Sequence, residues 1–148
     1  MPDLTFKVSG TSESAARMRV AARQFNIVVD EPPELGGSDA GPNPVEYVLA
    51  ALAGCINVTA HLVAKEMQIA LKSLSVDIEG DLNPARLLKN PTEDRAGYKS
   101  IRVQVKAATD ADEKTLAAWR DEIEARCPVS DNLGSATPIV VEVMPITA

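Results

Sequence analysis

One run of residues dominates this sequence, and it reads NPVEYVLAALAGCINVTAHLVA from Asn43 to Ala64. Asn43 is a favourable helix N-cap, Pro44 suits the first helical position, and Glu46 falls at the third. No charged residue follows Glu46 until Lys65. The run therefore predicts a helix from about Pro44 to Ala64 that is apolar on every side.

A helix of this length is nearly long enough to span a bilayer, which needs about 20 apolar residues. Asn57, Thr59 and His61 interrupt it, however, and alanine is more frequent in it than leucine or phenylalanine. We therefore expect a central core helix and no contact with a membrane. A sheet built from one chain would cover only one side of such a helix, so a second copy of the chain is expected to cover the rest. The prediction is a homodimer.

Segments that alternate between apolar and polar residues flank this helix and predict β-strands. The expected strands are Leu4–Val8, Arg17–Val20, Phe25–Val29, Leu74–Glu79, Ile101–Val105 and Pro138–Val143. Adjacent groups of strands with few helices between them indicate an α+β fold with mostly antiparallel pairing, in which a single sheet of about six strands covers the helix. We expect one domain over residues 1–148.

A second helix is expected from about Thr109. An apolar stripe runs along it at spacings of 3, 4 and 4 residues, formed by Leu116, Trp119, Ile123 and Cys127. Pro128 is expected to end this helix. Cys127 should therefore face the core.

The composition excludes several classes of function. A net charge of −6 and a pI near 4.8 argue against nucleic acid, whose phosphates select basic surfaces. The N-terminus lacks a basic segment followed by an apolar one, so we expect no signal peptide and a cytoplasmic protein without a structural disulfide. His61, the only histidine, lies six residues after Cys55, about 240° around a helix. The two side chains point apart, and we expect no zinc site and no other cofactor.

The two cysteines lie far apart in the sequence, each on an expected helix. Cys55 follows Ala53 and Gly54 inside the apolar run, and Cys127 begins the motif Cys-Pro-Val-Ser that ends at Ser130. In a chain without signs of secretion, such a pair suggests redox chemistry. The alternative is that each thiol is a small buried apolar residue, because free cysteine is among the most buried residue types.

These motifs resemble those of the OsmC/Ohr family of bacterial thiol peroxidases. The matching residues are Leu35-Gly36-Gly37, Asn43-Pro44, Ala53-Gly54-Cys55 and Cys127-Pro128-Val129-Ser130. They occur in the same order as in the family, and the resemblance runs from about Arg17 to Val143. The residues Val29–Gly37 and Gly41–Glu46 resemble those of a less characterised branch of this family.

The resemblance implies an OsmC-like fold, in which antiparallel sheets are shared across an intertwined homodimer with long central helices. It also implies a peroxidase that reduces organic hydroperoxides. Cys55 would be the peroxidatic thiol, Cys127 the resolving thiol, and an external dithiol the reductant, with an arginine and a glutamate assisting. Such chemistry needs a thiolate that attacks the O–O bond and a second thiol that condenses with the sulfenic acid.

The sequence departs from the family pattern at the glutamate. Better-known members carry a glutamate directly after the Asn-Pro dipeptide, whereas Val45 stands there in this chain and Glu46 follows it. Nine residues separate Glu46 from Cys55, about 180° around a regular helix, so the carboxylate should point away from the thiol. Glu46 then either assists Cys55 from an irregular helix start or forms a capping box with Asn43.

The assisting arginine is not determined by spacing. No lysine or arginine lies between Arg23 and Lys65, so a cation for Cys55 must come from another strand or from the other chain. Arg17, Arg19 and Arg23 are the candidates, with Arg19 slightly preferred. A guanidinium suits the role because it stays charged when partly buried.

Two other functions compete with the peroxidase. The displaced Glu46 and the very apolar helix favour a non-enzymatic dimer of the same fold that binds a small apolar molecule or a lipid. A thiol enzyme for acyl transfer is disfavoured, because the only histidine points away from Cys55.

Overall fold

The structure is a computed structural model that describes residues 1–146. Its helices and antiparallel strands make the chain an α+β protein, as predicted. The chain divides into two compact units, Met1–Ala50 and Ala51–Ala148, and each is described in turn.

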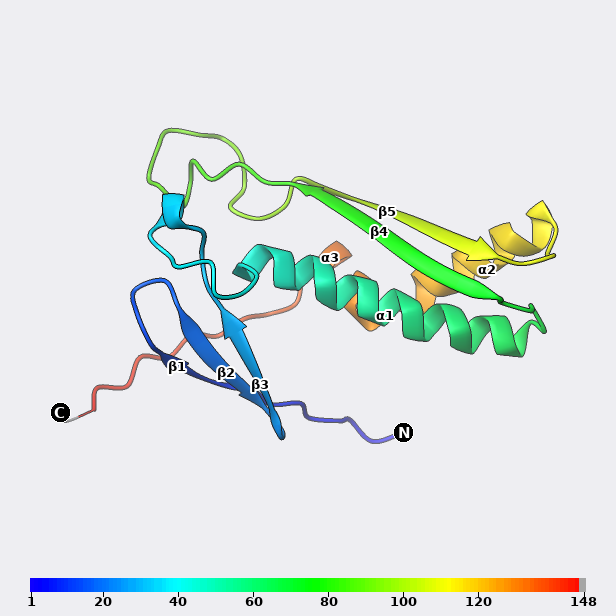
Figure 1. Ribbon diagram of the computed structural model, residues 1–148, viewed down its shortest axis with the longest axis horizontal. Helices are drawn as coiled ribbons and strands as arrows, with labels where there is room; N and C mark the ends of the chain where they lie inside the picture. The colour runs from blue at the N-terminus through cyan, green and yellow to red at the C-terminus, as the bar shows by residue number, and fades with distance from the viewer. Residues whose placement is uncertain (147–148) are drawn as a thin grey trace. The chain divides into compact units, whose positions relative to one another are not determined.

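The first unit is built on a three-stranded antiparallel sheet, drawn in blue in Figure 1. Its strands, in spatial order, are β1 (Ser9–Ser12), β2 (Met18–Ala22) and β3 (Phe25–Val29). The turn between β2 and β3 has two residues, and Arg23 in it has a φ of 55°. The guanidinium of Arg23 lies over the ring of Phe25, 5.2 Å from its centroid. The turn is thereby closed by a cation–π contact.

The strand predicted at Leu4–Val8 is wrong, because the first strand begins at Ser9. The side chains of Leu4, Phe6 and Val8 are 75%, 88% and 63% exposed. Their alternation creates an apolar face, but a strand also needs a neighbour that accepts and donates its backbone hydrogen bonds. Within the described residues, the pairing of β1 starts only at Ser9.

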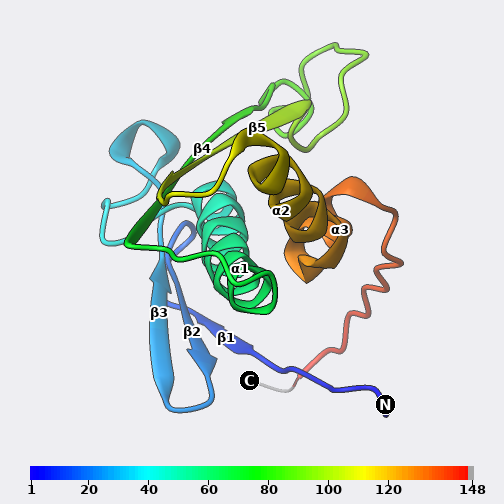
Figure 2. The same cartoon turned by 90° about the vertical axis from the view of Figure 1, so that its right-hand side faces the viewer.

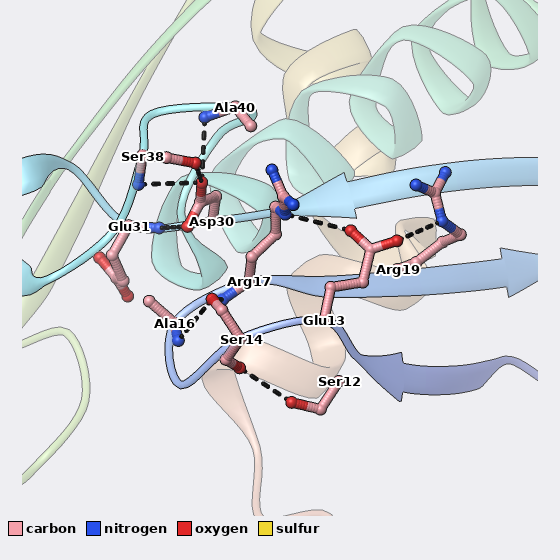
Figure 3. A network of polar contacts seen from close by, with 10 residues as sticks. All are labelled: Ser12, Glu13, Ser14, Ala16, Arg17, Arg19, Asp30, Glu31, Ser38 and Ala40. Carbon is pink, nitrogen blue, oxygen red and sulfur yellow. Dashed lines mark hydrogen bonds and ion pairs between the residues drawn. The ribbon is translucent and has the colours of Figure 1, made fainter.

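The loop after β3 is organised by hydrogen bonds to Asp30, which Figure 3 shows. The Asp30 side chain is fully buried. One carboxylate oxygen accepts hydrogen bonds from the Ser38 hydroxyl at 2.7 Å and from the N–H groups of Ser38 and Ala40 at 3.1 Å. The other accepts from the N–H of Glu31 at 2.9 Å. These donors, the Ser38 hydroxyl above all, lower the pKa of Asp30 to about 2. The loop also requires Gly37, because a Cβ there would lie 1.7 Å from the carbonyl oxygen of Glu31.

Helix α1 (Pro44–Glu66) follows this loop and its short 3-10 helix η1 (Pro33–Leu35). Its start is a capping box: the N–H of Glu46 donates to Asn43 Oδ1 at 2.9 Å, and the N–H of Asn43 donates to Glu46 Oε2 at 2.8 Å. The hydroxyl of Tyr47 donates to the carbonyl of Val28 at 2.8 Å, which joins the helix start to β3. The predicted helix is therefore confirmed.

The second unit packs helices under a β-hairpin (Figure 2). The hairpin pairs β4 (Ser73–Asp81) with β5 (Ser100–Ala108), and α2 (Glu113–Arg126) and α3 (Pro128–Gly134) follow it. Asp112 caps α2 by accepting from the N–H of Thr115 at 2.8 Å. The buried core combines residues of α1 with the predicted stripe of α2; its members are Leu52, Ile56, Ala60, Val63, Ala64, Trp119, Ile123 and Cys127.

Two predictions for this part of the chain are wrong. Pro138–Val143 has no regular secondary structure, and Ile139 and Val143 are 84% and 91% exposed. The described strands also form two sheets, of three and two strands, rather than one sheet of about six. Pro128 does end α2, but it also starts α3 because its fixed φ suits a first helical position.

The outer face of α1 is less buried than a helix apolar on every side requires. Val58 and Leu62 are 67% and 49% exposed. Among the described residues α1 is the one helix long and apolar enough to cross a membrane by length and composition. Core helices pass the same test, and here the helix contributes five of the eight core residues.

Candidate functional site

The two thiols meet in the second unit. Cys127 Sγ lies 2.9 Å from Cys55 Sγ, although 72 residues separate them. Both cysteines are free, and Cys127 donates a hydrogen bond to the sulfur of Cys55. A disulfide bond has an S–S distance of about 2.05 Å, so this pair is in the reduced form and close to bonding distance.

Cys127 is held at the junction of two helices. Its N–H donates to the carbonyl of Ile123 at 3.1 Å and so completes α2. Its sulfur accepts from the N–H of Ser130 at 3.4 Å and so caps α3. The side chain is only 1% exposed, whereas Cys55 is half-buried. The position of Cys127 is therefore determined by backbone contacts on both sides.

Two side-chain contacts fix α2 against α1 beside the thiols. The indole N–H of Trp119 donates to the carbonyl of Ala60 at 2.9 Å, and this bond is buried. The guanidinium of Arg126 grips the carboxylate of Glu66 with two bonds of 2.5 and 3.0 Å. Bidentate pairs of this kind impose orientation as well as attraction. Together the contacts hold α2 against α1, and Cys127 directly follows the last residue of α2.

The surroundings of Cys127 favour its neutral form. Burial and the hydrogen bond to Cys55 raise the pKa of the Cys127 thiol, and the N–H of Ser130 opposes this only in part. At neutral pH Cys127 is therefore a thiol that donates to the sulfur beside it. The arrangement can form a disulfide when one sulfur becomes electrophilic.

A cavity of about 660 Å³ adjoins Cys127 and is lined mainly by apolar side chains, together with Arg120 and Glu124. Its walls come from β5, α2 and α1, and they include Val103, Val105, Trp119 and Ile56. Ser130, which binds the Cys127 sulfur, also lines it. The volume is typical of sites for small organic molecules.

The remaining predicted residues lie in the first unit. Arg17 Nε and Arg19 Nε approach the two oxygens of Glu13 at 3.1 and 2.7 Å, as Figure 3 shows. Arg23 lies over Phe25, and Glu46 closes the capping box. The structure thus brings Cys55 and Cys127 together, and separately gathers Arg17 and Arg19 on one carboxylate.

Sequence reasoning missed several partners at these places. Glu13 could have been found from its spacing of four residues to Arg17, although this segment is not helical. Trp119 was expected only to pack, and no local pattern points to its bond with Ala60. Within residues 1–146, no group of three or more histidine, cysteine or acidic side chains could hold a metal ion.

The fold and the thiol pair define an α+β protein with a two-cysteine centre. A family model described as OsmC-like protein matches residues 36–142, and the chain belongs to this family. Comparison with curated proteins gave no significant match.

Solved structures share the fold. An OsmC-like protein from Mycoplasma pneumoniae is 23% identical with a TM-score of 0.77, and the alignment covers 90% of this chain and 89% of that one. An organic hydroperoxide resistance protein OsmC from Legionella pneumophila is 20% identical with a TM-score of 0.64, covering 90% and 91%. An organic hydroperoxide resistance protein from Elizabethkingia anophelis is 18% identical with a TM-score of 0.63, covering 88% of each chain.

Proposed function

We propose that this chain is a two-cysteine reductase of organic hydroperoxides. The observation that carries the proposal is the 2.9 Å distance between the sulfurs of Cys55 and Cys127. Further support comes from the family and from the names of two structural neighbours, which are organic hydroperoxide resistance proteins.

The chemistry runs in two steps. The thiolate of Cys55 attacks the terminal oxygen of the hydroperoxide, the O–O bond breaks, and the departing alkoxide takes a proton to become an alcohol. Cys55 is then a sulfenic acid. The Cys127 sulfur, losing its proton, attacks the Cys55 sulfur, and the hydroxyl group leaves as water. The disulfide returns to two thiols by exchange with an external dithiol, which is itself oxidised.

The different environments of the two thiols suit this order. Cys55 is half-buried and can meet a peroxide, while Cys127 is buried and has a raised pKa. The second thiol must stay protonated until its neighbour is oxidised, and a buried position favours the protonated form. In the proposed cycle Cys127 therefore acts second.

For activation of Cys55 we propose an arginine, with Arg19 ahead of Arg17 and Arg23. Arg17 and Arg19 share the single carboxylate of Glu13, so one positive charge between them is not neutralised there. We also propose that Glu46 assists Cys55. Its Oε2 accepts the hydrogen bond of the capping box, and its Oε1 has no hydrogen bond within residues 1–146.

Replacing the correct arginine with methionine should slow alkylation of Cys55 by iodoacetamide about tenfold at neutral pH, because the thiolate loses a neighbouring charge. Rates for the Arg17→Met, Arg19→Met and Arg23→Met variants would be compared by mass spectrometry. Parent-like rates in all three would remove the arginine from the mechanism.

We further propose that the two units form one OsmC-like domain in a cytoplasmic homodimer with shared sheets. The family model spans residues 36–142 and so includes parts of both units. The exposed apolar segments at Leu4–Val8 and Pro138–Val143, and the exposed face of α1 at Val58 and Leu62, need a covering surface.

The test of the peroxidase is the fate of the thiols. One equivalent of cumene hydroperoxide should convert both into a single intramolecular disulfide, detected by mass spectrometry as the loss of two hydrogen atoms. The Cys55→Ser variant should consume no peroxide, and Cys127→Ser should give one turnover and a sulfenic acid that dimedone traps. Two free thiols after excess peroxide would contradict the proposal.

A second candidate is a binding protein without catalytic activity. The cavity of about 660 Å³ favours it, since such a volume suits an apolar ligand whether or not the thiols react. In that case the thiols would survive the peroxide treatment and the cavity would still be occupied.

A further inference from the structure

We propose that Trp119 is a positioning residue for the thiol pair: its indole N–H, bound to the backbone of α1, sets how closely the sulfur of Cys127 approaches Cys55. The inference rests on the proposed two-cysteine chemistry and adds to it a residue that takes no part in the bond changes. Its basis is the place of one buried hydrogen bond, the weaker direction of the contacts around it, and its distance from each sulfur.

The hydrogen bond joins a side chain of α2 to the backbone of α1, and the two helices lie side by side in Figure 2. Trp119 is only 5% exposed, and its Nε1–H donates to the carbonyl oxygen of Ala60 at 2.9 Å. Ala60 is fully buried and carries a single methyl group, so the indole can reach the helix backbone. A carbonyl inside a helix also accepts from the N–H four residues later, and its oxygen has a second lone pair for the indole.

The other contacts between α1 and α2 fix their relative position less strictly. The shared core is apolar, and apolar burial attracts two helices without selecting one direction of approach. The pair of Arg126 with Glu66 also joins them, but these side chains are 34% and 49% exposed, where water and salt weaken an ion pair. A hydrogen bond in a buried, low-dielectric place is stronger and directional. The indole bond is therefore the main constraint on the orientation of α2.

Both sulfurs lie a short way along the helices from this bond. Cys55 comes five residues before Ala60, and Cys127 comes eight residues after Trp119. At the rise of a helix these separations are about 7.5 Å along α1 and about 12 Å along α2. A tilt of α2 by about 5° at Trp119 would therefore displace Cys127 by about 1 Å. The sulfurs are 2.9 Å apart and must come closer to bond, so such a displacement would matter.

The expected consequence is confined to one step of the proposed cycle. Attack on the peroxide uses only Cys55, so a looser α2 should leave its rate unchanged. Closure of the disulfide joins two sulfurs on different elements, and its rate and equilibrium depend on how well the pair is preoriented. An effect on closure without an effect on attack distinguishes a positioning role from a general loss of structure.

The single tryptophan of the chain allows the N–H to be removed without changing the packing. A tryptophan-requiring expression host supplied with benzothienylalanine replaces Trp119 by a ring of nearly the same shape, with sulfur in place of the N–H. Fluorotryptophan, which keeps the N–H, is the matched control. The Ala60 carbonyl retains its helical partner, so the analogue leaves no buried polar group unsatisfied. Trp119→Phe is a second protein without the donor.

The first measurement uses no peroxide. Reduced full-length protein would be equilibrated with glutathione and glutathione disulfide. The two protein thiols are oxidised to one disulfide, and one glutathione disulfide is reduced to two glutathione molecules, which take up the two hydrogens. The equilibrium constant should fall at least fivefold in the benzothienylalanine protein and in Trp119→Phe. It should change less than twofold with fluorotryptophan.

The second measurement separates closure from attack. With cumene hydroperoxide and dimedone present, the sulfenic acid of Cys55 is either trapped or closed by Cys127. The trapped share should rise at least threefold in the benzothienylalanine protein, while the first turnover consumes peroxide at the parent rate. A parent-like equilibrium constant in both donor-free proteins, or an unchanged trapped share, would overturn the inference. If the parent forms the disulfide with glutathione but consumes no peroxide, the peroxidase proposal fails and the glutathione measurement alone decides the role of Trp119.

Discussion

At the scale of single residues, Cys55 and Cys127 differ mainly in their surroundings. Cys127 is enclosed by α2 and α3, and burial removes it from reagents while also disfavouring its charged form. Cys55 is half-buried. The two cysteine side chains are chemically identical, so any difference in their reactivity comes from their surroundings in the fold.

We predict that iodoacetamide alkylates Cys55 at least tenfold faster than Cys127 in the reduced native protein at pH 7.5, because the thiolate is the reactive species and must be accessible. Peptide mapping by mass spectrometry at successive times gives both rates. In urea the two rates should become similar. Equal rates in the native protein would contradict the assignment of Cys127 as the protected thiol.

The environment of Asp30 also changes its chemistry, because it lowers the pKa of the carboxyl group. Its pKa falls from 3.8 to about 2 on folding, so the unfolded chain binds a proton more readily than the folded chain. The sign follows: its contribution to stability is complete above about pH 4 and is lost as the pH falls towards 2.

The Asp30→Asn variant should accordingly unfold at a lower temperature than the parent at pH 7, and the gap between them should shrink between pH 4 and pH 2. Thermal unfolding followed by circular dichroism measures both effects. Asp39→Asn changes the same loop at an exposed residue and should leave the unfolding temperature unchanged. A gap that stays constant with pH would refute the role of the ionised carboxylate.

At the scale of elements, α1 shows how a helix start is determined locally. Asn43 and Glu46 satisfy each other's backbone N–H groups, and Pro44 between them needs no donor at a first helical position. Glu46 is the residue that departs from the family pattern, and its position three residues after Asn43 is the one that a capping box requires.

Replacing Asn43 with alanine should lower the free energy of unfolding by about 1 kcal/mol, because the first turn loses a side-chain acceptor. Urea denaturation gives the value. Asn57→Ala is the control, since Asn57 is exposed in the middle of the same helix. A loss no larger than that of the control would show that the capping box contributes nothing measurable.

At the scale of the whole molecule, the most notable feature is the set of exposed apolar segments that pair with no described strand. Pro138–Val143 has the alternation of a strand and the exposure of a loop. Burying each such apolar side chain is worth roughly 1.5–3 kcal/mol, so a surface that pairs with this segment would gain substantially. A second copy of the chain is the partner that we propose.

The parent protein should sediment as a dimer at micromolar concentration. The double variant Ile139→Asp, Val141→Asp should dissociate at least tenfold more readily, because it places charges in the proposed interface. Glu142→Gln in the same segment should leave the dimer intact. Analytical ultracentrifugation decides the matter, and a well-folded parent monomer would refute the dimer.

Local patterns in the sequence were sufficient for much of the fold. The capping residues and the absence of charge predicted α1, the 3–4 spacing predicted the buried face of α2, and alternation located β3 to β5. These features depend on contacts between residues that are close in the sequence. The periodicity of apolar and polar residues reveals such contacts. The motifs around Cys55 and Cys127 also identified the family, although not the partners of each residue.

Contacts between distant residues were determined only by the tertiary structure. The approach of Cys127 to Cys55 and the bond from Trp119 to Ala60 join segments that lie far apart in the chain. The same holds for the two segments that alternate yet form no strand, Leu4–Val8 and Pro138–Val143. Alternation describes one chain segment by itself, whereas a strand exists only when a neighbouring backbone supplies its hydrogen bonds.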